Sequence, residues 1–138
     1  MGRILAVDLG EKNIGLAVSD PSGTIANPLG VIKHISRVED VQAIIRKARE
    51  LAVEQIIIGQ PLDHDGLEGR SARHARIFAE TMRSMTELPI ELWDESGSTI
   101  AARQARIAMG ASRKKRSGHL DDLAATYILQ TYLDRLQS

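Results

Sequence analysis

Cysteine is absent from this 138-residue chain. The absence excludes disulfide bridges, thiolate metal sites and cysteine nucleophiles. Aromatic residues make up only 3% of the sequence, so aliphatic side chains must build the core. No stretch approaches the roughly 18 consecutive apolar residues of a membrane-spanning helix, and the N-terminus lacks the apolar stretch of a signal peptide. We therefore expect a cytoplasmic protein that does not contact the membrane.

Net charge is also absent, because 18 basic residues balance 18 acidic ones. Total charge thus gives no sign of a nucleic-acid partner, but the distribution of charge does. Four consecutive basic residues occur without an acid between positions 111 and 120: Arg113, Lys114, Lys115 and Arg116. Such a concentrated patch can bind phosphate. Apolar residues make up 43% of the chain, which together with its length predicts one globular domain over residues 1–138.

The N-terminal part of the sequence favours three successive strands. Residues 3–8 and 14–19 are short apolar runs rich in β-branched residues, separated by a turn. Residues 25–35 are also extended in character, but Pro28 and Gly30 suit the edge of a sheet better than its centre. Short turns between the three strands predict an antiparallel meander.

Helices and strands then alternate. Ser36 and Glu39 form a capping box in front of a helix with apolar residues at helical spacing up to about residue 52. Further helices are predicted at about 70–85, 98–109 and 119–135, and further strands at 55–59 and 89–94. The order predicts an α/β fold: a mixed five-stranded sheet, three antiparallel strands followed by β–α units, flanked by helices.

Acidic residues follow the strands of this predicted sheet. Asp8 closes the first strand, and Asp94 and Glu95 close the fifth. Ligands of open α/β sheets gather beyond the carboxyl ends of the parallel strands, so these side chains should face one crevice. Asp63 and Asp65, in the loop after the fourth strand, could reach it too.

The last predicted helix adds two more carboxylates. At helical spacing Asp121 falls within the apolar arc, whereas Asp122 falls at its polar edge. A carboxylate directed toward a core is costly unless a cation compensates its charge. Asp8, Glu95 and Asp121 would suit Mg²⁺, which prefers carboxylate oxygens and supports phosphodiester hydrolysis. The alternative is that these acids cap turns or form structural salt bridges.

Four segments together resemble the YqgF/RuvX family of RNase H-like nucleases over nearly the whole chain. They are ILAVDLGEKNIGLAVSDPSG at 4–23, IIIGQPLDHDGLEG at 56–69, WDES at 93–96 and ASRKKRSGHLDDLAATYILQTYL at 111–133. The resemblance implies an RNase H-like fold and a Mg²⁺-dependent endonuclease, a phosphodiester hydrolase. The implied role is processing of the 5′ end of precursor 16S rRNA in ribosome biogenesis.

The resemblance also implies which residues act. Asp8 matches the family's first-strand catalytic aspartate, Glu95 the glutamate of its D-E-R segment, and Asp121 the aspartate before L-A-A in the last helix. These three would be both catalytic residues and ligands of Mg²⁺, for which Mn²⁺ could substitute. The chain departs from the family at Ser96, where the usual residue is arginine, and at Asp122, where many relatives carry a basic residue.

The implied partner is nucleic acid, with precursor rRNA favoured over branched DNA and ribosomal particles as a further partner. The four basic residues at 113–116 would contact its phosphates, and the protein would be a monomer or a homodimer. Two alternatives remain open: a Holliday-junction resolvase, and a catalytically weak RNA-binding assembly factor, which Ser96 favours. The pattern from Asp8 to Gly15 also resembles the phosphate loop of actin/hexokinase ATPases, but the chain has room for only one of their two domains.

Two groups of side chains support no single interpretation. Three arginines of the helix predicted at 70–85 could extend a nucleic-acid groove or merely form a solvated helix face: Arg70, Arg73 and Arg76. Three histidines lack metal-ligand spacing, so we expect them to be surface or loop residues: His64, His74 and His119. His119 is a weak candidate for phosphate contact.

Overall fold

The computed structural model describes residues 2–62, 67–94 and 120–137. Within these ranges the elements are β1 (Arg3–Leu9), β2 (Asn13–Ser19), β3 (Ala26–Lys33), α1 (Arg37–Glu50), β4 (Val53–Gln60), α2 (Arg70–Arg83), β5 (Ile90–Asp94) and α4 (Leu120–Leu136). The order matches the one predicted from the sequence, while the helix expected at 98–109 lies outside the described residues. None of the helices described is long and apolar enough to span a bilayer.

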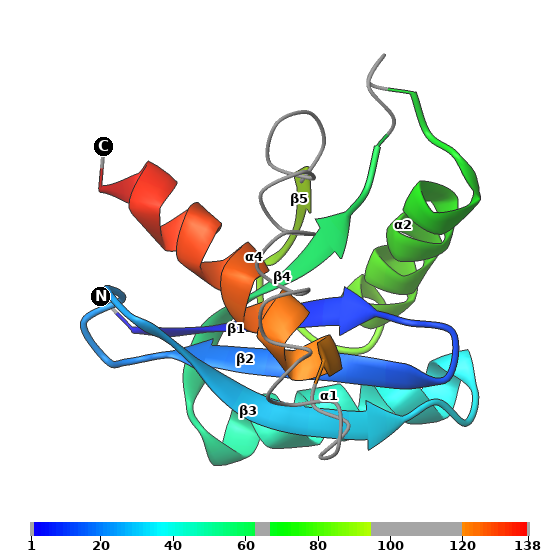
Figure 1. Ribbon diagram of the computed structural model, residues 1–138. Helices are drawn as coiled ribbons and strands as arrows, with labels where there is room; N and C mark the ends of the chain where they lie inside the picture. Colours follow the sequence, from blue (N-terminus) through cyan, green and yellow to red (C-terminus); the bar gives the residue numbers. More distant parts are fainter. Residues whose placement is uncertain (1, 63–66, 95–119, 138) are drawn as a thin grey trace.

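The strands form one sheet in the order β3-β2-β1-β4-β5 (Figure 1). The meander of β1, β2 and β3 is antiparallel, whereas β1 pairs with β4, and β4 with β5, in parallel. The predicted mixed five-stranded sheet is thereby confirmed. β3 lies at the edge, as predicted, and Gly30 within it has a φ of 135°, which glycine adopts without steric cost.

Helix α1 begins at the predicted cap. The Oγ of Ser36 accepts a hydrogen bond from the backbone N–H of Glu39 at 3.2 Å. An apolar stripe at helical spacing follows and packs against the sheet: Val41, Ile44, Ile45 and Ala48. Helix α2 contributes a matching stripe to the same core: Ala75, Phe78, Ala79 and Met82.

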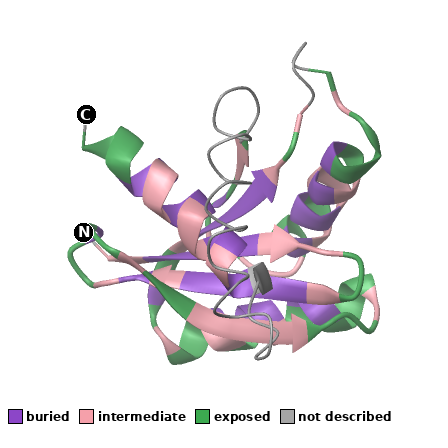
Figure 2. Cartoon of the chain, viewed as in Figure 1, coloured by how far each residue is buried: buried purple, intermediate pink, exposed green. Residues whose placement is uncertain are grey.

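Helices cover both faces of the sheet, so the protein has two apolar layers. Leu5 and Val7 of β1 pack into the layer beneath α1 and α2, whereas Ile4 and Ala6 pack into the layer beneath α4. Figure 2 shows this burial along the central strands. Because side chains alternate along a strand, Asp8 falls on the face that α4 covers.

Helix α4 crosses the meander in a defined direction (Figure 1). The Gln130 Nε2 donates a hydrogen bond to the Thr24 carbonyl at 3.1 Å, and the Gln137 Nε2 donates one to the Gly23 carbonyl at 3.2 Å. These carbonyls belong to the turn between β2 and β3, which lies beside the amino end of β1 because β2 is antiparallel to β1. The C-terminal half of α4 is therefore held at that end, and its first turn lies toward the carboxyl end of β1.

Candidate functional site

The carboxyl ends of the three parallel strands meet at one edge of the sheet. Val7 of β1 pairs with Ile58 of β4, and Gln60 of β4 pairs with Asp94 of β5. Asp8, half-buried, follows directly at the end of β1. The prediction that the first and fifth strands end at the same edge is confirmed.

The acids of the fifth strand differ in placement. Trp93 faces α4, since its Nε1 donates a hydrogen bond to the Thr131 Oγ1 at 3.0 Å and its ring lies edge-on to Tyr132 with centroids 5.2 Å apart. Asp94, the next residue, is exposed and by alternation belongs to the opposite face from Asp8. Glu95 lies outside the described residues, as do Asp63 and Asp65 of the loop after β4.

Asp122, in the first turn of α4, is buried, with only 5% of its surface exposed. The expectation that it lies at the polar edge of the helix is wrong. Leu129 and Leu133 are both fully buried, and they widen the apolar arc until it includes position 122. The side chain of Asp121 is outside the part that the structure describes.

Asp8 and Asp122 are the two carboxylates that the structure describes on this face of the sheet edge, and no group of three or more His, Asp or Glu side chains in the described part of the chain is placed to hold a metal ion. The two carboxylates share one face of the sheet, and the first turn of α4 lies toward the end of β1 where Asp8 stands. No side chain within residues 2–62, 67–94 and 122–137 donates a hydrogen bond or forms an ion pair with the Asp122 carboxylate. A buried carboxylate of this kind is stable only when a positive charge compensates it. Carboxylate oxygens of this kind are the ligands that Mg²⁺ prefers.

Replacing Asp122 with Asn is expected to stabilise the metal-free protein by about 1–2 kcal/mol, because it removes a desolvated charge. The helix macrodipole favours a carboxylate in a first turn by only about 0.3–1 kcal/mol and does not reverse the sign. Urea unfolding in EDTA measures the difference. Added Mg²⁺ should raise the stability of the wild type more than that of Asp122→Asn.

The matched control is Asp134→Asn, which makes the same change at an exposed position of α4 and should leave stability within about 0.5 kcal/mol. A metal-free Asp122→Asn protein that is less stable than the wild type would show that the carboxylate already has a favourable partner.

A cavity of about 540 Å³ opens at the same edge, between α1, α2 and the turn after β1. Its wall includes an acid–histidine pair that sequence reasoning missed. Asp40 is 2% exposed, its Oδ2 lies 2.5 Å from the His34 Nδ1, and its Oδ1 accepts a hydrogen bond from the Ile35 N–H at 3.0 Å. The sequence contained one signal for this pair, because Asp40 lies one helical turn before Ile44, on the face of α1 that carries the buried apolar stripe.

His74 lies on α2 rather than in a loop, is half-buried and lines this cavity. Burial lowers the pKa of His74, and the positive charges of Arg37 and His34 lower it further, against a smaller opposing effect of Asp40. The imidazole is therefore neutral at physiological pH. His64 and His119 lie outside the described residues.

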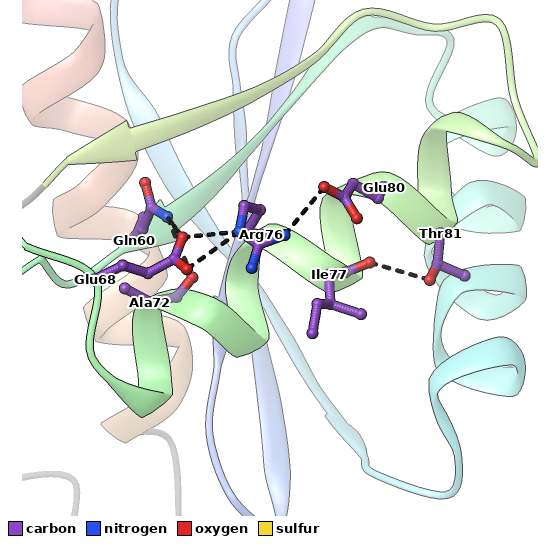
Figure 3. Close-up of polar contacts among 7 residues, drawn as sticks. All are labelled: Gln60, Glu68, Ala72, Arg76, Ile77, Glu80 and Thr81. Atoms are coloured by element: carbon purple, nitrogen blue, oxygen red, sulfur yellow. Dashed lines mark hydrogen bonds and ion pairs between the residues drawn. The ribbon is translucent and has the colours of Figure 1, made fainter.

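Of the three α2 arginines that the sequence left ambiguous, Arg70, Arg73 and Arg76, the last forms internal ion pairs (Figure 3). Its Nε donates to the two carboxylate oxygens of Glu68 at 2.9 and 3.1 Å, and its Nη1 donates to Glu80 at 3.2 Å. These bonds hold the residues before α2 against the helix. Arg70 lines the cavity and Arg73 is exposed on the same helix. The basic residues at 113–116 lie outside the described ranges.

A family model described as "RuvX: Holliday junction resolvase" matches residues 2–135. The chain belongs to the RuvX family. Its RuvX relatives include a Paracoccus denitrificans protein that is 42% identical over 136 residues, covering 99% of this chain and 86% of the relative. A Brucella anthropi protein is 44% identical over 135 residues, covering 98% and 82%. Both bear the name "Putative pre-16S rRNA nuclease".

Solved structures confirm the RNase H-like fold of this RuvX chain. Thermus thermophilus RuvC in complex with a Holliday junction superposes with a TM-score of 0.58 at 14% identity, covering 99% of this chain and 96% of RuvC. The Fowlpox virus resolvase in complex with Holliday junction DNA also superposes with a TM-score of 0.58, at 15% identity and with 99% of both chains covered.

Proposed function

We propose that this RuvX protein is a Mg²⁺-dependent endonuclease that cuts structured RNA at the 5′ end of precursor 16S rRNA. The observation that carries the proposal is the placement of two carboxylates, Asp8 at the carboxyl end of β1 and buried Asp122 in the first turn of α4, on one face of the sheet. The names of its relatives support the choice of substrate.

Asp8, Glu95 and Asp121 are the proposed ligands of the ion, and the burial of Asp122 adds it to the set. Mg²⁺ bound by these residues would act as a Lewis acid in phosphodiester hydrolysis, and Mn²⁺ would substitute for it. The protein itself fixes the position of Asp8 by pairing β1 with strands on both sides. Glu95 follows β5 directly in the sequence, and β5 ends at the sheet edge where Asp8 lies.

The basic residues at 113–116 are the proposed nucleic-acid contact. They precede α4 by a few residues in the sequence, and the first turn of α4 carries the proposed ligands. Cationic contacts to phosphate position a nucleic acid without reading its sequence. This segment would therefore hold the backbone near the carboxylates, with the RNA structure deciding where the cut occurs.

The proposal is tested by incubating the protein with the 5′ region of precursor 16S rRNA and with a four-way DNA junction of similar length, each in Mg²⁺ or EDTA. We expect cleavage of the RNA in Mg²⁺ alone. Preferential cleavage of the junction would instead establish a resolvase, which should also be dimeric in solution because its substrate is two-fold symmetric. Tight RNA binding with no cleavage under any condition would establish an assembly factor.

A further inference from the structure

We propose that the cavity between α1, α2 and the turn after β1 binds one nucleotide of the strand that is cut, with the phosphate at Arg37 and Arg70 and the base beside His74. The inference rests on the proposed nuclease function only for the source of the nucleotide. A free mononucleotide offers the same phosphate and base, and the experiment below separates the two sources.

Two arginines line this cavity from different helices. Arg37 is the first residue of α1 and Arg70 the first residue of α2, and both line the cavity. Within the described part of the chain, neither forms an ion pair with a carboxylate. Three acids line the cavity with them: Asp40 is buried and pairs with His34, Asp8 is half-buried and Glu11 is exposed. Guanidinium groups bind phosphate through paired hydrogen bonds.

Arg37 and Arg70 each lie in the first turn of a helix, where a positive charge is unfavourable unless an anion is bound nearby. A cation in the first turn opposes the helix macrodipole, whereas an anion there is favoured. Gly69, the N-cap of α2, provides no side-chain acceptor for the first N–H groups of that helix. A phosphate beside Arg70 would satisfy both the guanidinium and these N–H groups.

The remainder of the cavity suits a base. Its floor is apolar and buried, formed by Ile14, Ala75 and Phe78, each at most 2% exposed. His74 lies edge-on to Phe78, with ring centroids 6.2 Å apart and an interplanar angle of 65°. The neutral His74 ring can both stack on a base and hydrogen-bond to its edge.

Size and position agree with a nucleotide next to the cut. The volume of about 540 Å³ is within the range of roughly 300–1,000 Å³ of small-molecule sites. Asp8 and Gly59 also line the cavity. A nucleotide bound here would therefore be adjacent in the strand to the phosphate that approaches Asp8.

The test compares two double variants of the full chain. Arg37→Gln/Arg70→Gln removes both cavity charges. Arg46→Gln/Arg73→Gln removes the same charge from exposed positions of the same helices, outside the cavity. Binding of a 5′-phosphorylated single-stranded oligoribonucleotide is measured by fluorescence anisotropy in EDTA, so that cleavage is not required.

We expect the cavity variant to bind the oligonucleotide at least about tenfold more weakly and the control variant to bind within about twofold of the wild type. The His74 imidazole resonances of the wild type should shift on adding the oligonucleotide. A matching shift with AMP, but not with inorganic phosphate, would identify a free nucleotide as a ligand of the same site.

Equal weakening in both double variants, or a His74 resonance that responds to neither nucleotide, would overturn the assignment. Both arginines are exposed, so neither variant should lose stability, and thermal unfolding checks this. A cavity that binds nucleotide in a protein that never cleaves RNA would refute the nuclease proposal and leave the binding site standing.

Discussion

Replacing Asp8 with Asn is expected to reduce RNA cleavage in Mg²⁺ by about a thousandfold or more. A divalent ion contributes several kcal/mol of charge stabilisation to phosphodiester hydrolysis, and about 4 kcal/mol corresponds to a thousandfold in rate. The substitution keeps the size of the side chain and removes the charge that would hold the ion. Single-turnover cleavage with the RNA in saturating amounts of protein measures the effect on chemistry rather than on binding.

Asp134→Asn is the matched control, since it removes one carboxylate charge at the exposed far end of α4. It should cleave at the wild-type rate. Asp8→Asn should fold normally, because its neighbours in β1 and β2 supply the apolar packing there. A folded Asp8→Asn protein that cleaves as fast as the wild type would remove Asp8 from the reaction and refute the proposed ion site.

Leu129→Ala is expected to lower the free energy of unfolding by about 2–5 kcal/mol, the usual cost of deleting a buried leucine side chain. Leu129 is completely buried in the layer between α4 and the sheet. That layer packs the helix that carries Asp121 and Asp122 onto the sheet. Urea unfolding with a two-state fit measures the loss.

Leu136→Ala provides the comparison within the same helix. Leu136 is 47% exposed, so its truncation should cost less than about 1 kcal/mol. Similar losses for the two variants would mean that α4 is not docked on the sheet as described.

The fold was largely predictable because local patterns and global arrangement agree. The apolar runs of β1 and β2, the Ser36 cap of α1 and the edge signals of Pro28 and Gly30 all predict elements that the structure contains. Each of these signals depends on neighbours in the sequence or on one face of a single element. The mixed sheet then follows from the order of strands and helices.

The candidate site was less predictable, because burial depends on packing between distant segments. The end of β1 identified Asp8, but the depth at which α4 packs on the sheet decides that Asp122 is buried. The His34–Asp40 pair and the cavity beside it form only when the end of β3, α1 and α2 come together. Single-helix periodicity left Arg76 ambiguous for the same reason, since Glu68 lies outside its helix.

The way α4 is anchored has a consequence for ionic strength. Gln130 and Gln137 tie the helix to the β2–β3 turn through neutral amide hydrogen bonds. An apolar layer lies beneath the helix, and Thr131 and Tyr132 add side-chain hydrogen bonds to β4 and β5. Salt screens exposed charges but leaves such contacts largely intact. Rising ionic strength should therefore release a bound nucleic acid while α4, and the carboxylates it presents, stay in place on the sheet.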